Sequence, residues 1–506
     1  MNKIIILLLI HISYLTNAQT FWSDANLNYG KYQVGFNNYT KNDDTRTYSR
    51  IYDWDNVIHS RPMSISIWYP TNEAGKGKRM KVEDYMVILK QEEEWESMPN
   101  KRILSWFYSD SEHNRNRMTL ETKAWFKAPV MKVKFPVVIY APSYQASSTE
   151  NFVLCEFLAS HGYVVISSPS RGTENRFLSG GTTKDIETQA RDIEFLIGEA
   201  SSVPFVDINK LAVAGFSFGG ISNVLAQMKN EKVKAIVCLD GSVKYQLGKL
   251  LASPFADLSK VDVPFIFMSQ KDIPMEVMKA DKIDMTLNNQ FWFYDSLKFS
   301  DAYYLKFNDL THSYFSSMGV LFQERDLRQD KNDSEIIMSY GWVNQYALNF
   351  LNVYLKDNNE SLQFMKVEPG KNGVKSDVIT IDRKKSQKRK TTFEDFNESA
   401  MKQGYKDLES LNNQIKDQNP DFKLQEWKLN NLGLQLVFKK KFQEGISILS
   451  LATQLFPNSA NAFDSLAEGY LEVGNDQLAI VNFNQSLKLD PQNQNAIDKL
   501  KIVKRK

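Results

Sequence analysis

Lys210-Leu-Ala-Val-Ala-Gly-Phe-Ser-Phe-Gly-Gly220 joins an apolar, strand-like run to an amphipathic helix pattern. At the junction, Gly215, Ser217 and Gly219 form Gly-x-Ser-x-Gly, the pattern of a sharp strand-to-helix turn that exposes a nucleophilic serine. Such a turn strains the serine backbone, and its glycines are needed because side chains there would collide with neighbouring elements. This setting favours Ser217 as a nucleophile over an idle serine in a glycine-rich turn.

Around this turn, apolar strand-like runs alternate with helical patterns from Gly30 to Leu355. The alternation is typical of an α/β fold with a doubly wound, mostly parallel sheet, and the nearly continuous apolar strands indicate a sheet covered on both faces. We expect strands at 64–69, 135–140, 163–167, 211–214, 235–239, 264–268 and 303–307, and helices near 150–161, 184–200, 219–230 and 335–356.

Two stretches rich in aromatic residues, 72–128 and 274–300, interrupt this alternation. Aromatic insertions near a catalytic turn often build the substrate pocket or a lid. Ordinary packing of excursion helices explains the same composition equally well. We therefore expect 72–128 to be an insertion in the α/β domain and leave both roles open.

The chain begins with a short basic start and an apolar stretch from Ile4 to Leu15. This is the pattern of a secretory signal peptide, and the small residue Ala18 predicts cleavage before Gln19. We therefore expect a signal peptide over 1–18 and export to the periplasm or the medium. No later segment of the sequence is long and apolar enough to predict a membrane span.

Composition excludes several classes of site. The formal net charge is only +2, which argues against a nucleic-acid binder with a broad basic surface. The two cysteines, Cys155 and Cys238, lie in apolar runs and are expected to be small buried hydrophobes, not a disulfide. No Cys and His cluster has the spacing of metal ligands, so neither a metal nor another cofactor is expected.

The composition changes after Tyr354. Several Asn and Gly residues and the basic run Arg383–Lys390 predict a solvated linker over 358–392. From Phe393 onward the pattern is helical only. We therefore expect an α/β domain over 19–357 and an all-α domain over 393–506.

The helical domain contains a repeat of 34 residues. Leu432 and Leu466 have this separation, as do Pro457 and Pro491. The pattern closely resembles tetratricopeptide repeats, with clear units at 426–459 and 460–493. Such repeats usually bind protein surfaces along a concave face, which predicts a protein partner, and a helical cap that only stabilises the enzyme explains them equally well.

A serine nucleophile needs a base, and histidine is the usual one. Of the five histidines, only His312 follows the last expected strand, in Asn308-Asp-Leu-Thr-His-Ser-Tyr-Phe315. In this fold class the histidine comes last in chain order, on a loop at that position. Position and elimination therefore both indicate His312 as the base.

Two aspartates are candidates for the acid that orients the histidine. Asp240 follows the strand directly after the serine turn, and Asp272 follows the next strand, the more widespread location. Lys271 suggests a solvated turn at Asp272, whereas an apolar strand and Gly241 suggest a better shielded place for Asp240. Spacing alone does not choose between the two.

The oxyanion hole should combine the backbone N–H of Phe218, the residue after the nucleophile, with one from the loop that follows the strand at 135–140. That loop reads Ala141-Pro-Ser-Tyr-Gln145 and lacks the His-Gly pair that many relatives place there. We expect Tyr144 or Gln145 to supply the second donor.

Together, these residues resemble a known branch of the α/β-hydrolases. The serine turn at 215–220, Leu158-Ala-Ser-His-Gly-Tyr163, Leu239-Asp240, and His312 near Phe315 are similar to the platelet-activating-factor acetylhydrolases and dienelactone-hydrolase-like proteins, as are Gly30-Lys-Tyr-Gln-Val-Gly-Phe36 and Trp68-Tyr-Pro70. The acetylhydrolase likeness places the acid at Asp240 and implies hydrolysis of a carboxylic ester, on a short or oxidised acyl chain of a lipid, without a metal. Ser217 departs from the cysteine of dienelactone hydrolases proper.

The sequence thus predicts an exported serine hydrolase that cleaves small-molecule or lipid esters through Ser217, His312 and Asp240. Two alternatives stay open. The same site can serve a serine peptidase, although no propeller domain precedes it, and the hydrolase domain can be inactive in a protein whose repeats bind a partner.

Overall fold

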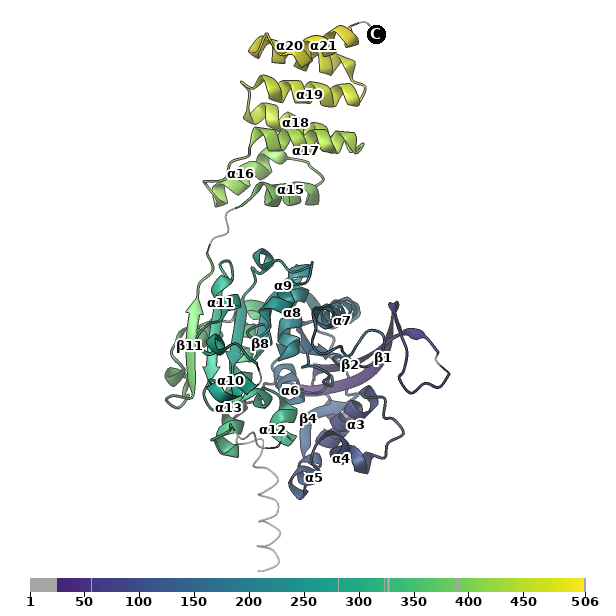
Figure 1. Ribbon diagram of the computed structural model, residues 1–506, viewed down its shortest axis with the longest axis vertical. Helices are drawn as coiled ribbons and strands as arrows, with labels where there is room; N and C mark the ends of the chain where they lie inside the picture. Colours follow the sequence, from purple (N-terminus) through teal and green to yellow (C-terminus); the bar gives the residue numbers. More distant parts are fainter. Residues whose placement is uncertain are drawn as a thin grey trace, which may run out of the picture. The chain divides into compact units, whose positions relative to one another are not determined.

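The computed structural model describes residues 25–55, 57–280, 282–322, 324, 328–387 and 391–504. Two compact units make up the chain, Met1–Gln387 and Lys388–Lys506 (Figure 1). The expected signal peptide over 1–18 lies outside the described residues.

The first unit is built on an eleven-stranded sheet of order β11-β10-β9-β8-β7-β5-β6-β2-β1-β4-β3. Strands β5 to β10 run parallel to their neighbours in this group, whereas β2 joins β6, β1 joins β2, and β11 joins β10 in antiparallel fashion. The expected mostly parallel α/β sheet is confirmed. The strands are β1 (Gln33–Tyr48), β2 (His59–Thr71), β3 (Lys78–Lys81), β4 (Glu121–Phe126), β5 (Phe135–Ala141), β6 (Val164–Ser167), β7 (Val206–Phe216), β8 (Val233–Leu239), β9 (Phe265–Ser269), β10 (Ala302–Phe307) and β11 (Ile379–Lys384).

The helices of this unit cover the sheet and extend from its edges. They are α3 (Val82–Glu92), α4 (Ile103–Phe107), α5 (Glu112–Met118), α6 (Phe152–Ser160), α7 (Thr183–Ser202), α8 (Phe218–Lys229), α9 (Leu247–Leu251), α10 (Met275–Ala280), α11 (Trp292–Ser296), α12 (Ser317–Phe322), α13 (Asp333–Lys356) and α14 (Asn359–Lys366), with 3-10 turns η1 (Ala74–Lys76), η2 (Asn100–Arg102), η3 (Leu258–Lys260), η4 (Met285–Asn288), η5 (His312–Phe315) and η6 (Pro369–Asn372).

Alternate residues of the central strands enter two separate hydrophobic cores. Val137 and Ile139 of β5 pack in the core that α7 and α8 cover. Val138 and Tyr140 pack in the core that α6 and α13 cover. Since neighbouring side chains of a strand point to opposite faces, a sheet buried on both faces needs apolar residues at every position, as β5 has.

The expected insertion over 72–128 carries η1, β3, α3, η2, α4, α5 and β4, and adds β3 and β4 to the edge of the sheet beside β1. Its anchor is Tyr85 of α3, which is fully buried. The Tyr85 hydroxyl accepts a hydrogen bond from Trp68 Nε1 at 2.8 Å and donates one to Glu156 Oε1 at 2.8 Å. The insertion therefore packs into the same core as α6.

The structure corrects the linker expected over 358–392. Most of that stretch belongs to the first unit, which ends at Gln387 and not at 357. It forms α14, η6 and β11, and β11 pairs with the whole of β10. The charged side chains suggested a solvated linker, but Ile379 and Ile381 alternate with polar residues, as in an edge strand whose other face meets solvent. Arg383 also donates to the carbonyl oxygens of Met365 and Val367, which fixes β11 to α14.

The second unit is helical, as expected, and its first helix begins at Phe393. Its helices are α15 (Phe393–Lys402), α16 (Leu408–Gln418), α17 (Glu426–Phe438), α18 (Phe442–Leu455), α19 (Ala460–Glu472), α20 (Asp476–Leu489) and α21 (Gln494–Val503). Gly433 of α17 lies so close to α18 that a Cβ there would be 2.5 Å from Leu449 Cγ. The close approach explains the small residue at this position of the repeat.

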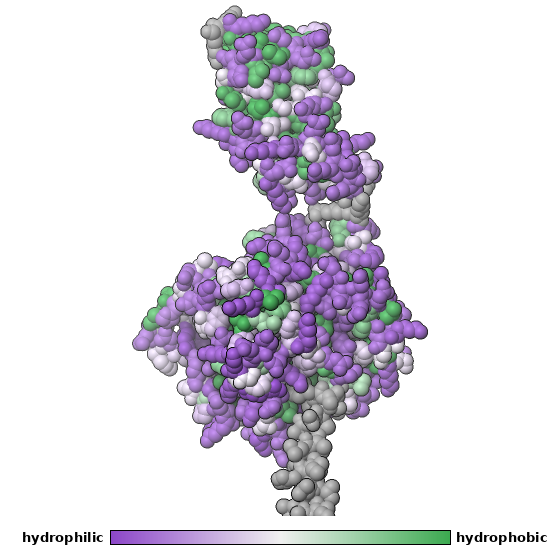
Figure 2. Space-filling view, turned by 180° about the vertical axis from the view of Figure 1, so that it is seen from behind, coloured by the Kyte–Doolittle hydropathy of each residue, from purple (hydrophilic) through white to green (hydrophobic). Residues whose placement is uncertain are grey.

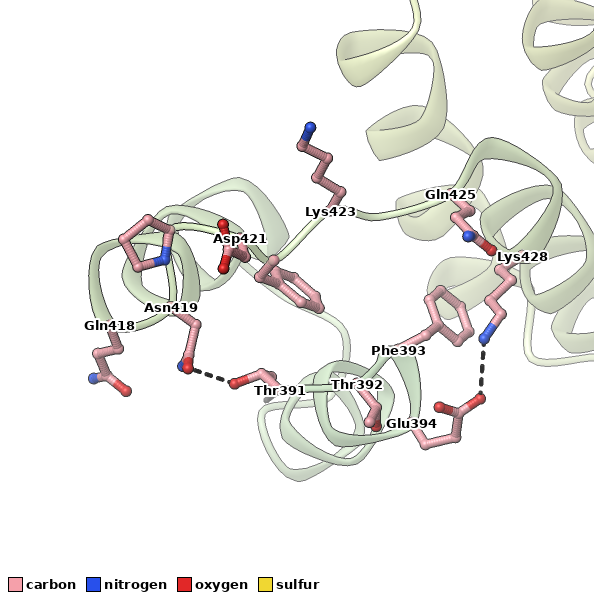
Figure 3. Close-up of a pocket in the computed structure, with 12 residues that line it drawn as sticks. Thr391, Thr392, Phe393, Glu394, Gln418, Asn419, Asp421, Lys423, Gln425 and Lys428 are labelled. Carbon is pink, nitrogen blue, oxygen red and sulfur yellow. Dashed lines mark hydrogen bonds and ion pairs between the residues drawn. The ribbon is translucent and has the colours of Figure 1, made fainter. Parts of the chain in front are cut away.

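A cavity of about 590 Å³ lies at the start of this unit, between α15, the end of α16 and the start of α17. Figure 3 shows two interactions on its wall, Asn419 Nδ2 to Thr391 Oγ1 at 2.8 Å and Lys428 Nζ to Glu394 Oε1 at 3.3 Å. Phe393 and Phe422 supply apolar surface. None of the side chains predicted for catalysis lines it.

Candidate active site

Ser217 stands alone between β7 and α8 in a strained conformation, with φ 52° and ψ −115°. Both flanking glycines are needed. A Cβ on Gly219 would be 2.0 Å from the carbonyl oxygen of Ala141, and one on Gly215 would be 2.5 Å from Asn223 Nδ2. Close packing between β5, β7 and α8 thus fixes the turn that presents the serine hydroxyl.

The structure brings Ser217, His312 and Asp240 together. His312 Nε2 lies 2.9 Å from Ser217 Oγ, and His312 Nδ1 lies 2.6 Å from Asp240 Oδ2. His312 opens η5, just after β10, and Asp240 directly follows β8. The three side chains therefore converge at the carboxyl-terminal edge of the parallel strands, where ligands bind in open α/β sheets.

Asp240 is fully buried, and three donors surround its carboxylate. Besides His312, these are the Tyr245 hydroxyl at 3.0 Å and the Gln270 backbone N–H at 3.2 Å, both on Oδ1. The side chain of Gln270 also accepts the backbone N–H of His312 at 3.1 Å. A carboxylate held by several donors keeps one orientation.

Asp272, the alternative acid, lies elsewhere. Its carboxylate pairs with Lys306 Nζ at 3.0 Å, and its side chain is 55% exposed. Of the two aspartates, only Asp240 meets the histidine. Lys271 beside it pairs through Nζ with Asp330 at 2.8 Å.

The two expected sources of oxyanion donors both border the serine. Phe218 is the first residue of α8, so its backbone N–H has no acceptor within the helix. Across from it, the Tyr144 ring packs edge-on against the Phe218 ring at 5.6 Å, and the Tyr144 hydroxyl accepts the N–H of Gly180 at 2.8 Å. The loop after β5 therefore lies next to the first turn of α8.

Gln145 has a left-handed backbone, with φ 56°. Its side-chain amide is held at both ends, because Nε2 donates to the carbonyl of Arg176 at 3.0 Å and Oε1 accepts the N–H of Leu178 at 2.5 Å. The side chains of Tyr144 and Gln145 thus both bind the segment 176–180. Their backbone N–H groups are the candidates for the second oxyanion donor.

The buried carboxyl group of Glu150 holds the loop after β5 in place. Glu150 accepts the backbone N–H of Ser143 at 2.8 Å and also the Ser143 hydroxyl. Burial raises the pKa of Glu150 to about 7, and the hydrogen bonds from Ser143 and the nearby His312 oppose this rise. Sequence reasoning missed Glu150, Tyr245 and Gln270, since no motif marks them and their partners lie up to 42 residues away.

Other expected features can be placed as well. Cys155 and Cys238 are both free and buried. Across the described ranges, no group of three or more His, Cys, Asp and Glu side chains is arranged to hold a metal ion. None of the helices built from the described residues combines the length and apolarity of a membrane span.

A comparison with protein families agrees with this architecture. Residues 128–324, which include Ser217, Asp240 and His312, match the model of a family described as PET hydrolase-like. This match supports an α/β-hydrolase of the ester-hydrolase type over less than half of the chain. A ferulic acid esterase from Streptomyces cinnamoneus is 15% identical, with a TM-score of 0.45, over 70% of this chain and 97% of its own. No curated protein is significantly similar to the chain.

Proposed function

We propose that this protein is an exported serine hydrolase that cleaves carboxylic esters through an acyl-enzyme. The observation that carries the proposal is the unbroken chain of contacts from Ser217 Oγ to His312 Nε2 and from His312 Nδ1 to Asp240 Oδ2. The family match over 128–324 supports ester hydrolysis in particular.

In the first step, Ser217 Oγ attacks the acyl carbon while His312 Nε2 takes the hydroxyl proton. Asp240 holds the other proton of the imidazole on Nδ1, so that Nε2 is free to accept. The charge that forms on His312 faces the buried carboxylate. The histidine then gives its proton to the departing alcohol, which leaves the acyl group on Ser217.

The negative oxygen of the tetrahedral intermediate is held by backbone N–H groups. Phe218 supplies one of them from the first turn of α8, where the helix dipole adds to the attraction. Tyr144 or Gln145 supplies the other. In the second step, His312 takes a proton from water as the water oxygen attacks the acyl carbon. The histidine then returns this proton to Ser217 Oγ as the bond to the acyl carbon breaks and the acid is released.

The substrate class is a carboxylic ester with a short acyl chain, including acyl esters of lipids. One feature supports the acetylhydrolase-like assignment. The acid, Asp240, directly follows β8, the first strand after the serine turn, as it does in that branch.

Hydrolysis of nitrophenyl acetate and butyrate by the purified chain tests this function. We expect turnover by the wild-type protein and its loss in Ser217→Ala with an unchanged circular dichroism spectrum. Equal turnover by the variant would overturn the assignment. Cleavage of peptides but not esters would instead favour the peptidase alternative.

We also propose that α17–α20 are two tetratricopeptide-type repeats that bind a protein partner. The 34-residue spacing and the close approach at Gly433 support the repeat type. Binding of a partner by Ser217→Ala as well as by the wild type would separate this role from catalysis. If the immobilised full chain retains no protein from the extracellular fraction of the organism that produces it, the repeats are better explained as a helical cap that stabilises the enzyme.

A further inference from the structure

The first unit contains a cavity that the hydrolase mechanism does not use. It has a volume of about 360 Å³ and lies between β1, β2, the end of α3 and the loop after β6; we call it the hairpin pocket. This volume is in the range of small-ligand sites. Its charged lining consists of three guanidinium groups and three carboxyl groups, from Arg50, Arg61, Arg171, Glu92, Glu94 and Glu96.

Most of these charges already have partners within the protein. Arg61 is buried and binds Asp192 through Nη1 at 2.7 Å, and Arg171 binds Glu93 at 2.6 Å. Glu92 is buried and accepts hydrogen bonds from Ser147 and Ser148. The balanced and paired lining favours a neutral ligand over an anion or a cation.

The carboxyl group of Glu94 is less completely paired. Its backbone is left-handed, with φ 59°, an uncommon conformation for a residue with a side chain. Its Oε1 accepts the Tyr48 hydroxyl at 2.6 Å, whereas its Oε2 is shielded from solvent and accepts no hydrogen bond from the described residues. Arg50 Nε lies 3.8 Å from that oxygen and Arg50 Nη2 pairs with Glu96. A ligand hydroxyl that donates to Glu94 and accepts from Arg50 would complete this arrangement.

Three packed aromatic rings belong to residues near the pocket residues in the chain. Tyr52 packs on Trp95 with ring centroids 6.1 Å apart, and Trp95 packs on Trp106 at 4.7 Å. Tyr52 is 59% exposed and Trp106 is 52% exposed. Residues 50, 94 and 96 of the pocket are close neighbours of these rings in sequence. We call Tyr52, Trp95 and Trp106 the aromatic strip.

The charges around the strip argue against a lipid surface. Trp54, near the tip of the β1–β2 hairpin, is 92% exposed, but Asp53 and Asp55 flank it. Insertion of this loop into a membrane would remove their carboxylates from water at a high cost. Figure 2 shows hydrophobic side chains dispersed among hydrophilic ones at the edge of the first unit where the hairpin projects in Figure 1.

We propose that the hairpin pocket and the aromatic strip bind a neutral oligosaccharide. A pyranose ring has apolar C–H faces for the aromatic rings and hydroxyl groups at its edge, which can both donate to Glu94 and accept from Arg50. Exposed Tyr and Trp rings give large contact areas at a low entropic cost. This class of ligand uses both the polar pocket and the rings beside it.

The pocket also connects to the candidate active site. Arg171 lines the pocket and its Nη1 donates to the carbonyl of Ala146 at 3.1 Å, next to Gln145. Glu92 binds the following residues of the same loop, Ser147 and Ser148. A bound saccharide would therefore contact groups that hold the oxyanion loop. This part of the inference, that the saccharide carries the ester, rests on the proposed function.

Affinity electrophoresis tests saccharide binding without turnover when the full chain, and each variant of it, carries the Ser217→Ala substitution. The gels contain acetylated xylan or acetylated glucomannan as neutral probes, and polygalacturonate as an anionic one. We expect retardation by at least one neutral probe. In the same background, Tyr52→Ala and Glu94→Gln should each weaken it about tenfold, as expected for removal of an aromatic anchor or of the carboxylate that accepts the ligand hydroxyl. Trp292→Ala is the matched control, because Trp292 is an exposed tryptophan elsewhere in the unit, and should change nothing.

Absence of retardation by both neutral probes would overturn the proposal, as would equal retardation of the Tyr52→Ala variant. Binding to polygalacturonate alone, or to phosphatidylcholine vesicles in a flotation assay, would also overturn it. In the Ser217-containing protein, Tyr52→Ala should raise KM for acetylated xylan and leave nitrophenyl acetate unchanged. If the wild-type protein does not hydrolyse nitrophenyl acetate, only the proposed function is rejected, because saccharide binding is measured separately on the Ser217→Ala chain.

Discussion

Replacement of Asp240 by asparagine removes the charge that faces His312 and keeps the size of the side chain. Asp240 accepts hydrogen bonds from His312 Nδ1 at 2.6 Å, from the Tyr245 hydroxyl at 3.0 Å and from the Gln270 N–H at 3.2 Å. An asparagine has one acceptor oxygen, and the two donors on the Oδ1 side will hold it. Its NH₂ group then faces Nδ1.

The imidazole must respond by moving its proton to Nε2, where it points at Ser217. In this tautomer Nε2 cannot accept the serine proton, and no buried charge stabilises the imidazolium. We expect kcat for nitrophenyl acetate to fall by about 10³- to 10⁴-fold, which corresponds to roughly 4–5.5 kcal/mol in the barrier. Asp272→Asn is the matched control, because its exposed carboxylate pairs only with Lys306 among the ion pairs described, and it should change kcat less than about twofold.

Steady-state kinetics of the wild type and the two variants, each checked for folding by circular dichroism, measure both effects. Loss of activity in Asp272→Asn together with full activity in Asp240→Asn would contradict the assignment of Asp240 as the acid, since the acid would then lie after β9. An equal loss in both variants would show that the contact at Asp240 is not what orients His312.

Three further results are expected. Tyr245→Phe removes one donor from Asp240 and should lower kcat about tenfold without unfolding the chain; wild-type kinetics would contradict the positioning role. Burial raises the pKa of Glu150 from 4.5 to about 7, so the folded state favours the protonated carboxyl group. Relative to Glu150→Gln, the wild-type free energy of unfolding should therefore be highest below pH 4.5 and should fall by up to roughly 3 kcal/mol as the pH rises to 7. Urea unfolding at pH 4.5 and 8 measures the change, and a pH-independent difference would contradict it. Gly433→Ala, whose Cβ would meet Leu449, should destabilise the helical unit by about 1–3 kcal/mol and leave ester hydrolysis intact, which calorimetry and kinetics of the full chain compare; loss of hydrolysis would contradict independent units.

The central part of the fold could be predicted from sequence because its strands contain nearly continuous apolar runs. Residues 135–140 and 235–239 show this clearly, and both are buried strands of the parallel sheet. The outer strands of the sheet lack this signal. β1 mixes Asn, Thr and Asp with apolar residues at its solvent-facing positions, so its sequence does not predict a strand. β11 carries charged residues at such positions, and its sequence therefore resembles a linker.

The candidate site divides in the same way. Ser217 and His312 could be placed from a local motif and from chain order, which the fold itself dictates. The choice between Asp240 and Asp272 could not, because both follow strands at the same sheet edge and only their spatial partners differ. Tyr245 and Gln270 carry no local pattern at all, since their role arises where separate loops meet around one carboxylate.

The most direct test of the account is the covalent reaction of Ser217. The full chain is treated with a fluorophosphonate probe, digested, and the modified peptide is identified by mass spectrometry, with Ser217→Ala treated in parallel. We predict a single labelled residue, Ser217, and no label in the variant. Labelling of another residue, or an unlabelled wild-type chain that is otherwise folded, would contradict the proposal that the contacts among Ser217, His312 and Asp240 form a working nucleophile.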